Sequence, residues 1–171
     1  MSRAELILYA TPNGPLADAL YELFDRLRRD APTTAQTYPP HCTLTGFFHR
    51  GRADVARVID DAHAAVTAVA PPASVTVERL RLAPDWVGLE LTAPWLLAVT
   101  EAFADRHVLG DGDDALRPKD WLHLSIAYGD GDLDTAASLA SEMDPTLDAA
   151  WDVGVWERAA DGSWTDLSRR R

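Results

Sequence analysis

A tetrapeptide pattern that occurs twice constrains this chain more than any other feature. His41-Cys42-Thr43-Leu44 and His123-Leu124-Ser125-Ile126 each read histidine, apolar, hydroxyl, apolar, and they begin 82 positions apart. Alternation with a period of two is typical of a β-strand, because successive side chains point to opposite faces. Each copy therefore predicts a strand with a histidine and a hydroxyl on one face and two apolar side chains on the other.

The same offset recurs in the segments that precede the two tetrapeptides. Tyr9-Ala10-Thr11-Pro12 and Leu91-Thr92-Ala93-Pro94 each end a predicted strand and lead into a predicted helix, and Tyr21 and Phe103 match inside these helices. Internal repetition is worth establishing before a fold is assigned. We expect a duplicated unit, with pseudo-repeats over roughly residues 4–82 and 83–171, that brings both histidines to one shared site.

Hydrophobic periodicity predicts strands that alternate with helices. Strands are predicted at Glu5–Ala10, His41–Phe48, Ser74–Leu82, Trp86–Thr92, Asp120–Gly129, Asp152–Arg158 and Ser163–Leu167, and helices at Leu16–Arg29, Arg52–Ala70, Trp95–Val108 and Asp132–Met143. Because several neighbouring strands are joined by short turns, we expect an α+β fold with mixed or antiparallel sheets that line a central groove and helices outside. Since no linker rich in Gly or Ser divides the halves, residues 1–171 should form a single bilobal domain.

The charge and the cysteine content bear on partners and location. The chain has 27 acidic and 16 basic residues, a net charge of −11. Long nucleic acid is bound largely through Lys and Arg, so we favour a small phosphorylated ligand instead. One cysteine excludes an internal disulfide framework, and no apolar run is long enough for a signal peptide or a membrane span. We therefore expect a cytoplasmic protein, without membrane contact and monomeric.

The paired tetrapeptides contain the residue types that phosphodiester chemistry needs. Imidazole titrates near neutral pH, so one histidine can be a neutral base while the other is a charged acid. The hydroxyls of Thr43 and Ser125 can donate hydrogen bonds to an anion between the strands. Either His41 or His123 can be the base, because the pattern is the same in both copies.

These motifs resemble those of a known superfamily. Pro40-His41-Cys42-Thr43-Leu44 and His123-Leu124-Ser125-Ile126 look like the paired H-x-S/T-x motifs of the two-histidine (2H) phosphoesterases, and the segment from His123 to Asp130 is similar to their cyclic phosphodiesterase branch. That branch acts on 2′,3′-cyclic nucleotides and ADP-ribose 1″,2″-cyclic phosphate. The resemblance implies a bilobal α+β fold whose groove holds both motifs. It also implies that one histidine activates water, that the other protonates the departing ribose oxygen, and that Thr43 and Ser125 bind the phosphoryl oxygens.

The sequence therefore predicts a cyclic phosphodiesterase that needs no metal and no cofactor, with two alternatives. An enzyme that processes RNA ends, either an RNA 2′,3′-cyclic phosphodiesterase or a 2′-5′ RNA ligase-like protein, would use the same motifs, although the acidic charge disfavours RNA. A non-catalytic nucleotide-binding protein would hold its ligand without turnover. A pure binder, however, has no need for two titrating groups.

Aromatic residues near the motifs are candidates for contacting the nucleobase. Trp121 has the same strand parity as His123, so it should face the groove, where a base could stack on it. Packing at the rim is the alternative interpretation, and Tyr9 is a weaker candidate for the same role. Lys119 and Arg117, at the end of a predicted mobile loop, could close over a phosphate, but a solvated loop is the simpler interpretation.

The remaining histidines differ from the paired ones. His49, His63 and His107 have no hydroxyl two positions further on, so we expect structural or surface roles for them. No two histidines are spaced four residues apart and the chain has one cysteine, so the spacing of a zinc site is absent.

Overall fold

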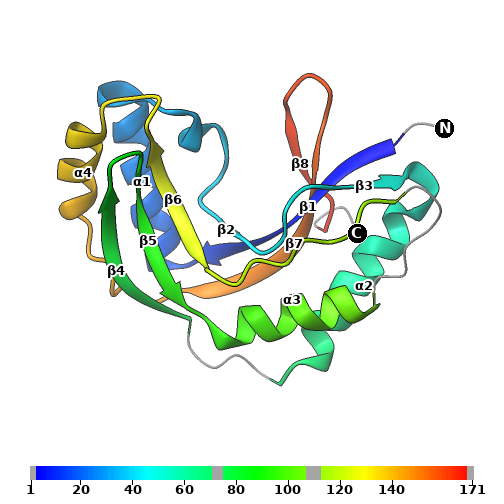
Figure 1. The fold of residues 1–171 in the computed structure, drawn as a ribbon. Coiled ribbons are helices and arrows are strands. Elements are labelled where there is room, and N and C mark those ends of the chain that lie inside the picture. The colour runs from blue at the N-terminus through cyan, green and yellow to red at the C-terminus, as the bar shows by residue number, and fades with distance from the viewer. Residues whose placement is uncertain (1–2, 71–74, 107–112, 169–171) are drawn as a thin grey trace.

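A central antiparallel sheet organises the molecule in the computed structural model, which describes residues 3–70, 75–106 and 113–168 (Figure 1). Its strands are β1 (Arg3–Asn13), β2 (Cys42–Thr43), β3 (Phe48–Gly51), β4 (Thr76–Ala83), β5 (Trp86–Thr92), β6 (His123–Tyr128), β7 (Ala150–Arg158) and β8 (Trp164–Asp166). The α-helices of the described residues are α1 (Pro15–Asp30), α2 (Val55–Ala68), α3 (Pro94–Arg106) and α4 (Leu133–Ser141), and 3₁₀ turns cover Thr34–Thr37 and Arg52–Asp54.

The sheet is open and has eight strands. Their order is β4-β5-β6-β2-β1-β7-β8, and β3 pairs with β1 beside this path. Every pair of neighbouring strands is antiparallel. The predicted α+β class and the antiparallel pairing are therefore confirmed, and the strands form one continuous sheet.

Each central strand presents one face to the helices and the other to the candidate site. In β1 the side chains of Leu6, Leu8 and Ala10 are buried in the core, and those of Glu5 and Thr11 point to the opposite face. The helices cover the apolar face and lie outside the curved sheet (Figure 1). Helix α4 packs against α1 and the strands β4–β6, whereas α2 packs against α3 and β7. The opposite face of the central strands, which also carries Ile7 and Tyr9 of β1, is left for the candidate site.

Helix α1 shows why this arrangement follows from the sequence. Pro15 stands in its first turn, where the missing N–H costs no hydrogen bond. Its apolar residues recur at three and four positions and form one buried stripe, made up of Leu16, Leu20, Leu23, Phe24 and Leu27. The opposite side of the helix is charged and exposed.

The strand predicted at His41–Phe48 is in fact two strands, β2 and β3, separated by Leu44–Phe47. The hydroxyl of Thr45 accepts a hydrogen bond from the backbone N–H of Leu8 at 3.1 Å. The Thr45 side chain thus accepts a hydrogen bond that a main-chain carbonyl would accept in a regular pair of β-strands. The predicted strand at Asp120–Gly129 is also shorter and begins at His123. The predicted helix end at Val108 lies outside the described residues.

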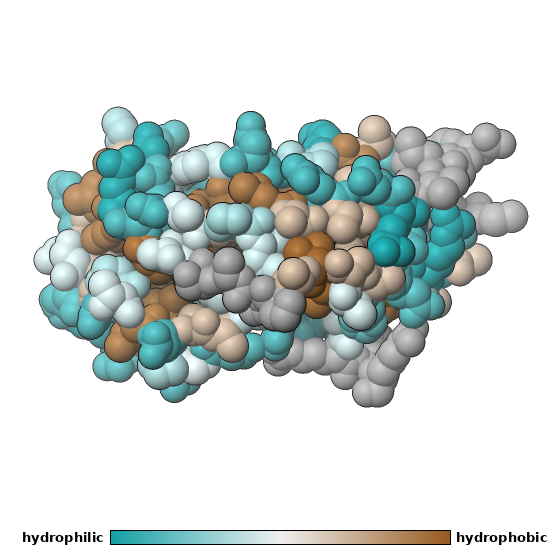
Figure 2. All heavy atoms as spheres, turned by 90° about the horizontal axis from the view of Figure 1, so that it is seen from below, coloured by the Kyte–Doolittle hydropathy of each residue, from teal (hydrophilic) through white to brown (hydrophobic). Residues whose placement is uncertain are grey.

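The matched pair inside the two helices differs in burial. The side chain of Phe103 is buried, whereas Tyr21 is 49% exposed, so the two rings do not occupy equivalent environments. On the lower face of the molecule, as oriented in Figure 1, hydrophilic and hydrophobic residues are interspersed (Figure 2). None of the helices in the described part of the chain is long and apolar enough to cross a membrane.

Candidate active site

The two tetrapeptides lie on neighbouring strands. Cys42 of β2 faces Leu124 of β6 in an antiparallel pair, and both side chains are fully buried in the core. One step along this register, His41 stands beside Ser125 and Thr43 beside His123, all on the opposite face. Directly opposed residues have Cβ atoms about 4.5–5.5 Å apart and diagonal neighbours about 7–8 Å. The two imidazoles therefore form a diagonal pair flanked by the two hydroxyls.

The imidazole of His41 is fixed in one tautomer. Its Nδ1 lies 2.8 Å from the carbonyl oxygen of Pro39, and because a carbonyl only accepts, Nδ1 carries the proton. The lone pair of the neutral ring is then on Nε2. Burial lowers the pKa of His41 to about 4, against the opposing effect of the Pro39 carbonyl and with a smaller contribution from the charge of His123. At neutral pH, His41 is an uncharged base.

His123 is held between aromatic rings and is less isolated from charge. Its ring stacks on Trp121 with centroids 4.2 Å apart and meets Trp86 edge to face at 5.0 Å. Burial lowers its pKa as well, and the positive charge of Lys119 acts in the same direction. The Trp121 backbone and the carboxylate of Glu90 oppose this shift.

Glu90 is a residue of this site that the sequence analysis did not single out. It pairs in register with His123 across β5 and β6, and only 11% of its side chain is exposed. Arg79 and Arg81 both donate to its carboxylate and hold its pKa below the usual range. A negative charge beside His123 favours the protonated imidazole. Glu90 thus favours the protonated form of His123, against the larger effect of burial, whereas no carboxylate of the described residues acts in this way on His41.

Trp86 orients the hydroxyl of Ser125. Its indole Nε1 donates a hydrogen bond of 3.0 Å to Ser125 Oγ. Because that contact uses a lone pair, the hydroxyl proton stays free to donate to a ligand. The indole lies across Gly88, where a Cβ would come within 2.2 Å of Trp86 Cζ2. Glycine two positions after a tryptophan within a strand is the sequence feature that could have indicated this contact.

A cavity of about 350 Å³ lies on the His41 side of the pair. It is lined by Ile7, Tyr9, Tyr38, His41, Thr43, Thr45, Gly46, Phe47, Arg117, Lys119 and Tyr128. No carboxylate is among these lining residues, and two of them are cations. Trp164 packs on the aromatic wall, with its ring 4.9 Å from Tyr38 and 5.6 Å from Phe47. The volume is in the range of small-molecule sites.

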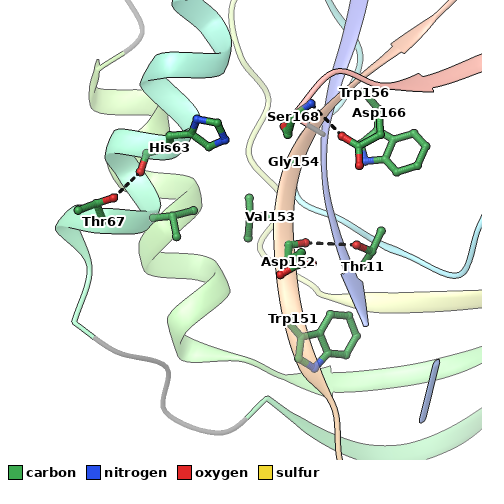
Figure 3. A pocket seen from close by; sticks show the side chains of 11 residues that line it. Thr11, His63, Thr67, Trp151, Asp152, Val153, Gly154, Trp156, Asp166 and Ser168 are labelled. Atoms are coloured by element: carbon green, nitrogen blue, oxygen red, sulfur yellow. Dashed lines mark hydrogen bonds between the residues drawn. The ribbon is translucent and has the colours of Figure 1, made fainter. Parts of the chain in front are cut away.

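A larger cavity, about 400 Å³, lies elsewhere, between helix α2 and the edge of β7 (Figure 3). His63, Thr67, Trp151 and Asp152 are among its lining residues, and none of the four residues of the tetrapeptide site is. It therefore does not bear on the paired histidines.

The aromatic candidates and the histidines outside the tetrapeptides lie in different surroundings. Trp121 is 45% exposed beside His123, and Arg81 lies 5.5 Å from its ring centroid. Tyr9 is buried, with its ring 3.9 Å from that of His41, and burial raises its pKa. His49 pairs with Asp114 at 2.6 Å, whereas His107 lies outside the described residues. Within the described ranges, no three His, Cys, Asp or Glu side chains are grouped as metal ligands would be.

No model of a protein family and no curated protein matches this sequence.

Proposed function

We propose that this protein is a metal-independent phosphodiesterase of the two-histidine type that opens a cyclic phosphate, such as a 2′,3′-cyclic nucleotide or an ADP-ribose cyclic phosphate. The observation that carries the proposal is the pairing of β2 with β6 around Cys42 and Leu124. That pairing brings two imidazoles and two hydroxyls to one face of the sheet. Both motifs are needed for such chemistry, and they come from segments 82 residues apart.

The sheet order supports a duplicated, bilobal arrangement with a groove between the halves. The strand order β5-β6-β2-β1 is symmetric about the β6–β2 contact. Each tetrapeptide strand has one longer strand on its outer side, β5 beside β6 and β1 beside β2. Each outer neighbour also leads into a helix, β1 into α1 and β5 into α3. The proposed groove lies along the β6–β2 contact, on the face that holds the histidines.

The two histidines have different roles in this mechanism. Neutral His41 accepts a proton from water through Nε2, and the water oxygen forms a bond to phosphorus. Protonated His123 donates its proton to the ribose oxygen as the bond from phosphorus to that oxygen breaks. Thr43 and Ser125 donate hydrogen bonds to the non-bridging oxygens, where negative charge develops. The ring opens to a phosphomonoester, and both histidines recover their starting protonation by exchange with solvent.

Product identification tests the proposal. The protein is incubated with 2′,3′-cyclic mononucleotides, ADP-ribose cyclic phosphate and RNA that ends in a cyclic phosphate. We expect linear phosphomonoesters from the small substrates. Turnover of RNA ends alone would favour the RNA-processing alternative, and tight binding without product would favour the non-catalytic one.

Turnover should persist when divalent metal ions are removed, because His41 and His123 supply both the base and the acid. The measurement is the rate of cyclic phosphate hydrolysis before and after dialysis against EDTA, with Mg²⁺ or Mn²⁺ added back to one portion. A rate that collapses in chelator and returns with a metal ion would contradict the paired-histidine mechanism.

Replacing Trp121 with alanine should raise KM by about tenfold and largely spare kcat. We expect this because stacking of a base on an aromatic ring contributes about 1–3 kcal/mol and acts equally before and during the chemical step. Steady-state kinetics and thermal melting of Trp121→Ala are the measurements. An unchanged KM with a lower melting temperature would assign Trp121 to packing against His123 and Arg81.

A further inference from the structure

Two cations, Arg117 and Lys119, line the His41 cavity. Most basic residues that the structure describes are ion-paired, as Arg52 is with Glu157 and Arg158 with Glu5. Arg117 and Lys119 have no carboxylate within ion-pair distance among the described residues, yet the chain has a net charge of −11. Lys119 is also the only lysine of the chain. Both side chains are exposed to solvent at this cavity, and its lining has no acidic residue, so they are available to bind an anion.

The backbone holds both cations in place beside the extension of β2. The N–H of Gly46 donates to the carbonyl of Arg117 at 2.8 Å, and the N–H of Lys119 donates to the carbonyl of Leu44 at 2.9 Å. Thr45 and Pro118 form a bridge between these hydrogen bonds. Residues 117–119, at the end of the loop expected from the sequence, are therefore hydrogen-bonded beside the site.

The guanidinium of Arg117 has a defined position with donors to spare. It lies across Gly46, where a Cβ would come within 3.0 Å of Nε, and Nη2 donates to the carbonyl of Phe47 at 3.0 Å. A guanidinium has five N–H donors, so others remain for a ligand. Gly46 follows Thr43 by three residues, which span at most about 10 Å in a fully extended chain. The guanidinium is thus held at Gly46 and Phe47, three and four residues after Thr43 along the chain.

We propose that Arg117 and Lys119 form an anion subsite that binds a second phosphate group of the substrate. This inference rests on the proposed function for the position of the first phosphate. The chemical class that fits is a nucleoside cyclic phosphate with a further phosphate on its 5′ oxygen. Arg117 supplies a planar set of donors and Lys119 a flexible point charge, and both recognise phosphate oxygens.

Kinetics with two matched substrates test the subsite. Adenosine 2′,3′-cyclic phosphate is compared with the same compound carrying a 5′-phosphate, and the readout is the ratio of their kcat/KM values. We expect the 5′-phosphate to raise kcat/KM by about tenfold or more in the wild type, since a charged hydrogen bond contributes about 1.5–3 kcal/mol. Arg117→Gln and Lys119→Gln should each reduce that ratio towards one. Arg29→Gln removes the charge of an exposed arginine on α1, outside the cavity, and should leave the ratio unchanged.

A binding measurement separates this proposal from the proposed function. Adenosine 2′-phosphate and adenosine 2′,5′-bisphosphate are titrated into the wild type and the Arg117→Gln variant by calorimetry. Tighter binding of the bisphosphate, lost in the variant, supports the subsite even if neither cyclic substrate is hydrolysed. Hydrolysis with no advantage for the 5′-phosphate in either assay overturns the subsite and leaves the phosphodiesterase proposal standing. Failure of both nucleotides to bind overturns the subsite as well.

Discussion

Replacing either His41 or His123 with alanine is expected to lower kcat for a cyclic phosphate by about 10²–10⁴-fold, the usual contribution of a general acid or base. His41→Ala removes the Nε2 lone pair that the hydrogen bond to Pro39 leaves free. His123→Ala removes the proton that Glu90 helps to retain. Because each variant leaves the other imidazole in place, neither is expected to abolish binding.

Two comparisons control these variants. Circular dichroism and thermal melting show whether each variant keeps the fold, so that a loss of turnover can be assigned to chemistry. His63→Ala is the matched control, since His63 lies on α2 and lines the other cavity. It should keep wild-type turnover. A folded His41→Ala or His123→Ala variant with near-wild-type kcat would show that the missing histidine is structural.

The pH dependence of kcat/KM should be bell-shaped with its maximum in the mildly acidic range. This parameter reports the ionisations of the free enzyme. His41 must be neutral to act as the base, and burial lowers its pKa to about 4, so activity should fall below that pH. His123 must be protonated to act as the acid, and its pKa is lowered from 6.5, so activity should already be declining as the pH rises to 6.5. Because the two sites interact, the apparent values belong to the pair.

Rates measured at several pH values test this expectation, and the fold must be monitored at each pH. The pKa of His41 is lower in the folded state than the unfolded value of 6.5, so the unfolded chain binds more protons between these values. His41 therefore contributes to the free energy of unfolding in full above pH 6.5. That contribution, roughly 3 kcal/mol, is lost as the pH falls from 6.5 towards 4. Circular dichroism separates this loss of stability from the acidic limb of the rate. A kcat/KM that still rises through neutral pH would contradict the assigned roles.

The sequence was informative where structure depends on local pattern. Alternation in the two tetrapeptides placed Cys42 and Leu124 in the core, and the three-and-four spacing of apolar residues located α1 within a residue at each end. Both patterns follow from the geometry of a single element, so neighbours in space are not needed to interpret them.

Features that depend on distant residues were not predicted. The break between β2 and β3 arises where Thr45 bonds to Leu8, a residue 37 positions away. Glu90 lies beside His123 only because β5 and β6 pair in one particular register. The backbone hydrogen bonds that join residues 117–119 to Leu44 and Gly46 were not predicted either, because they leave no local pattern in the sequence.

The claim that His41 and His123 act as one acid–base pair is tested most directly by kcat of the double variant beside the two single variants. Groups that act as a unit give strongly non-additive losses. The fold reduction in kcat of the double His41→Ala/His123→Ala variant should therefore be far smaller than the product of the two single reductions. Its kcat should approach that of the single variant with the lower kcat. Losses that multiply in a folded double variant would mean that the two imidazoles act independently, and the paired mechanism would be wrong.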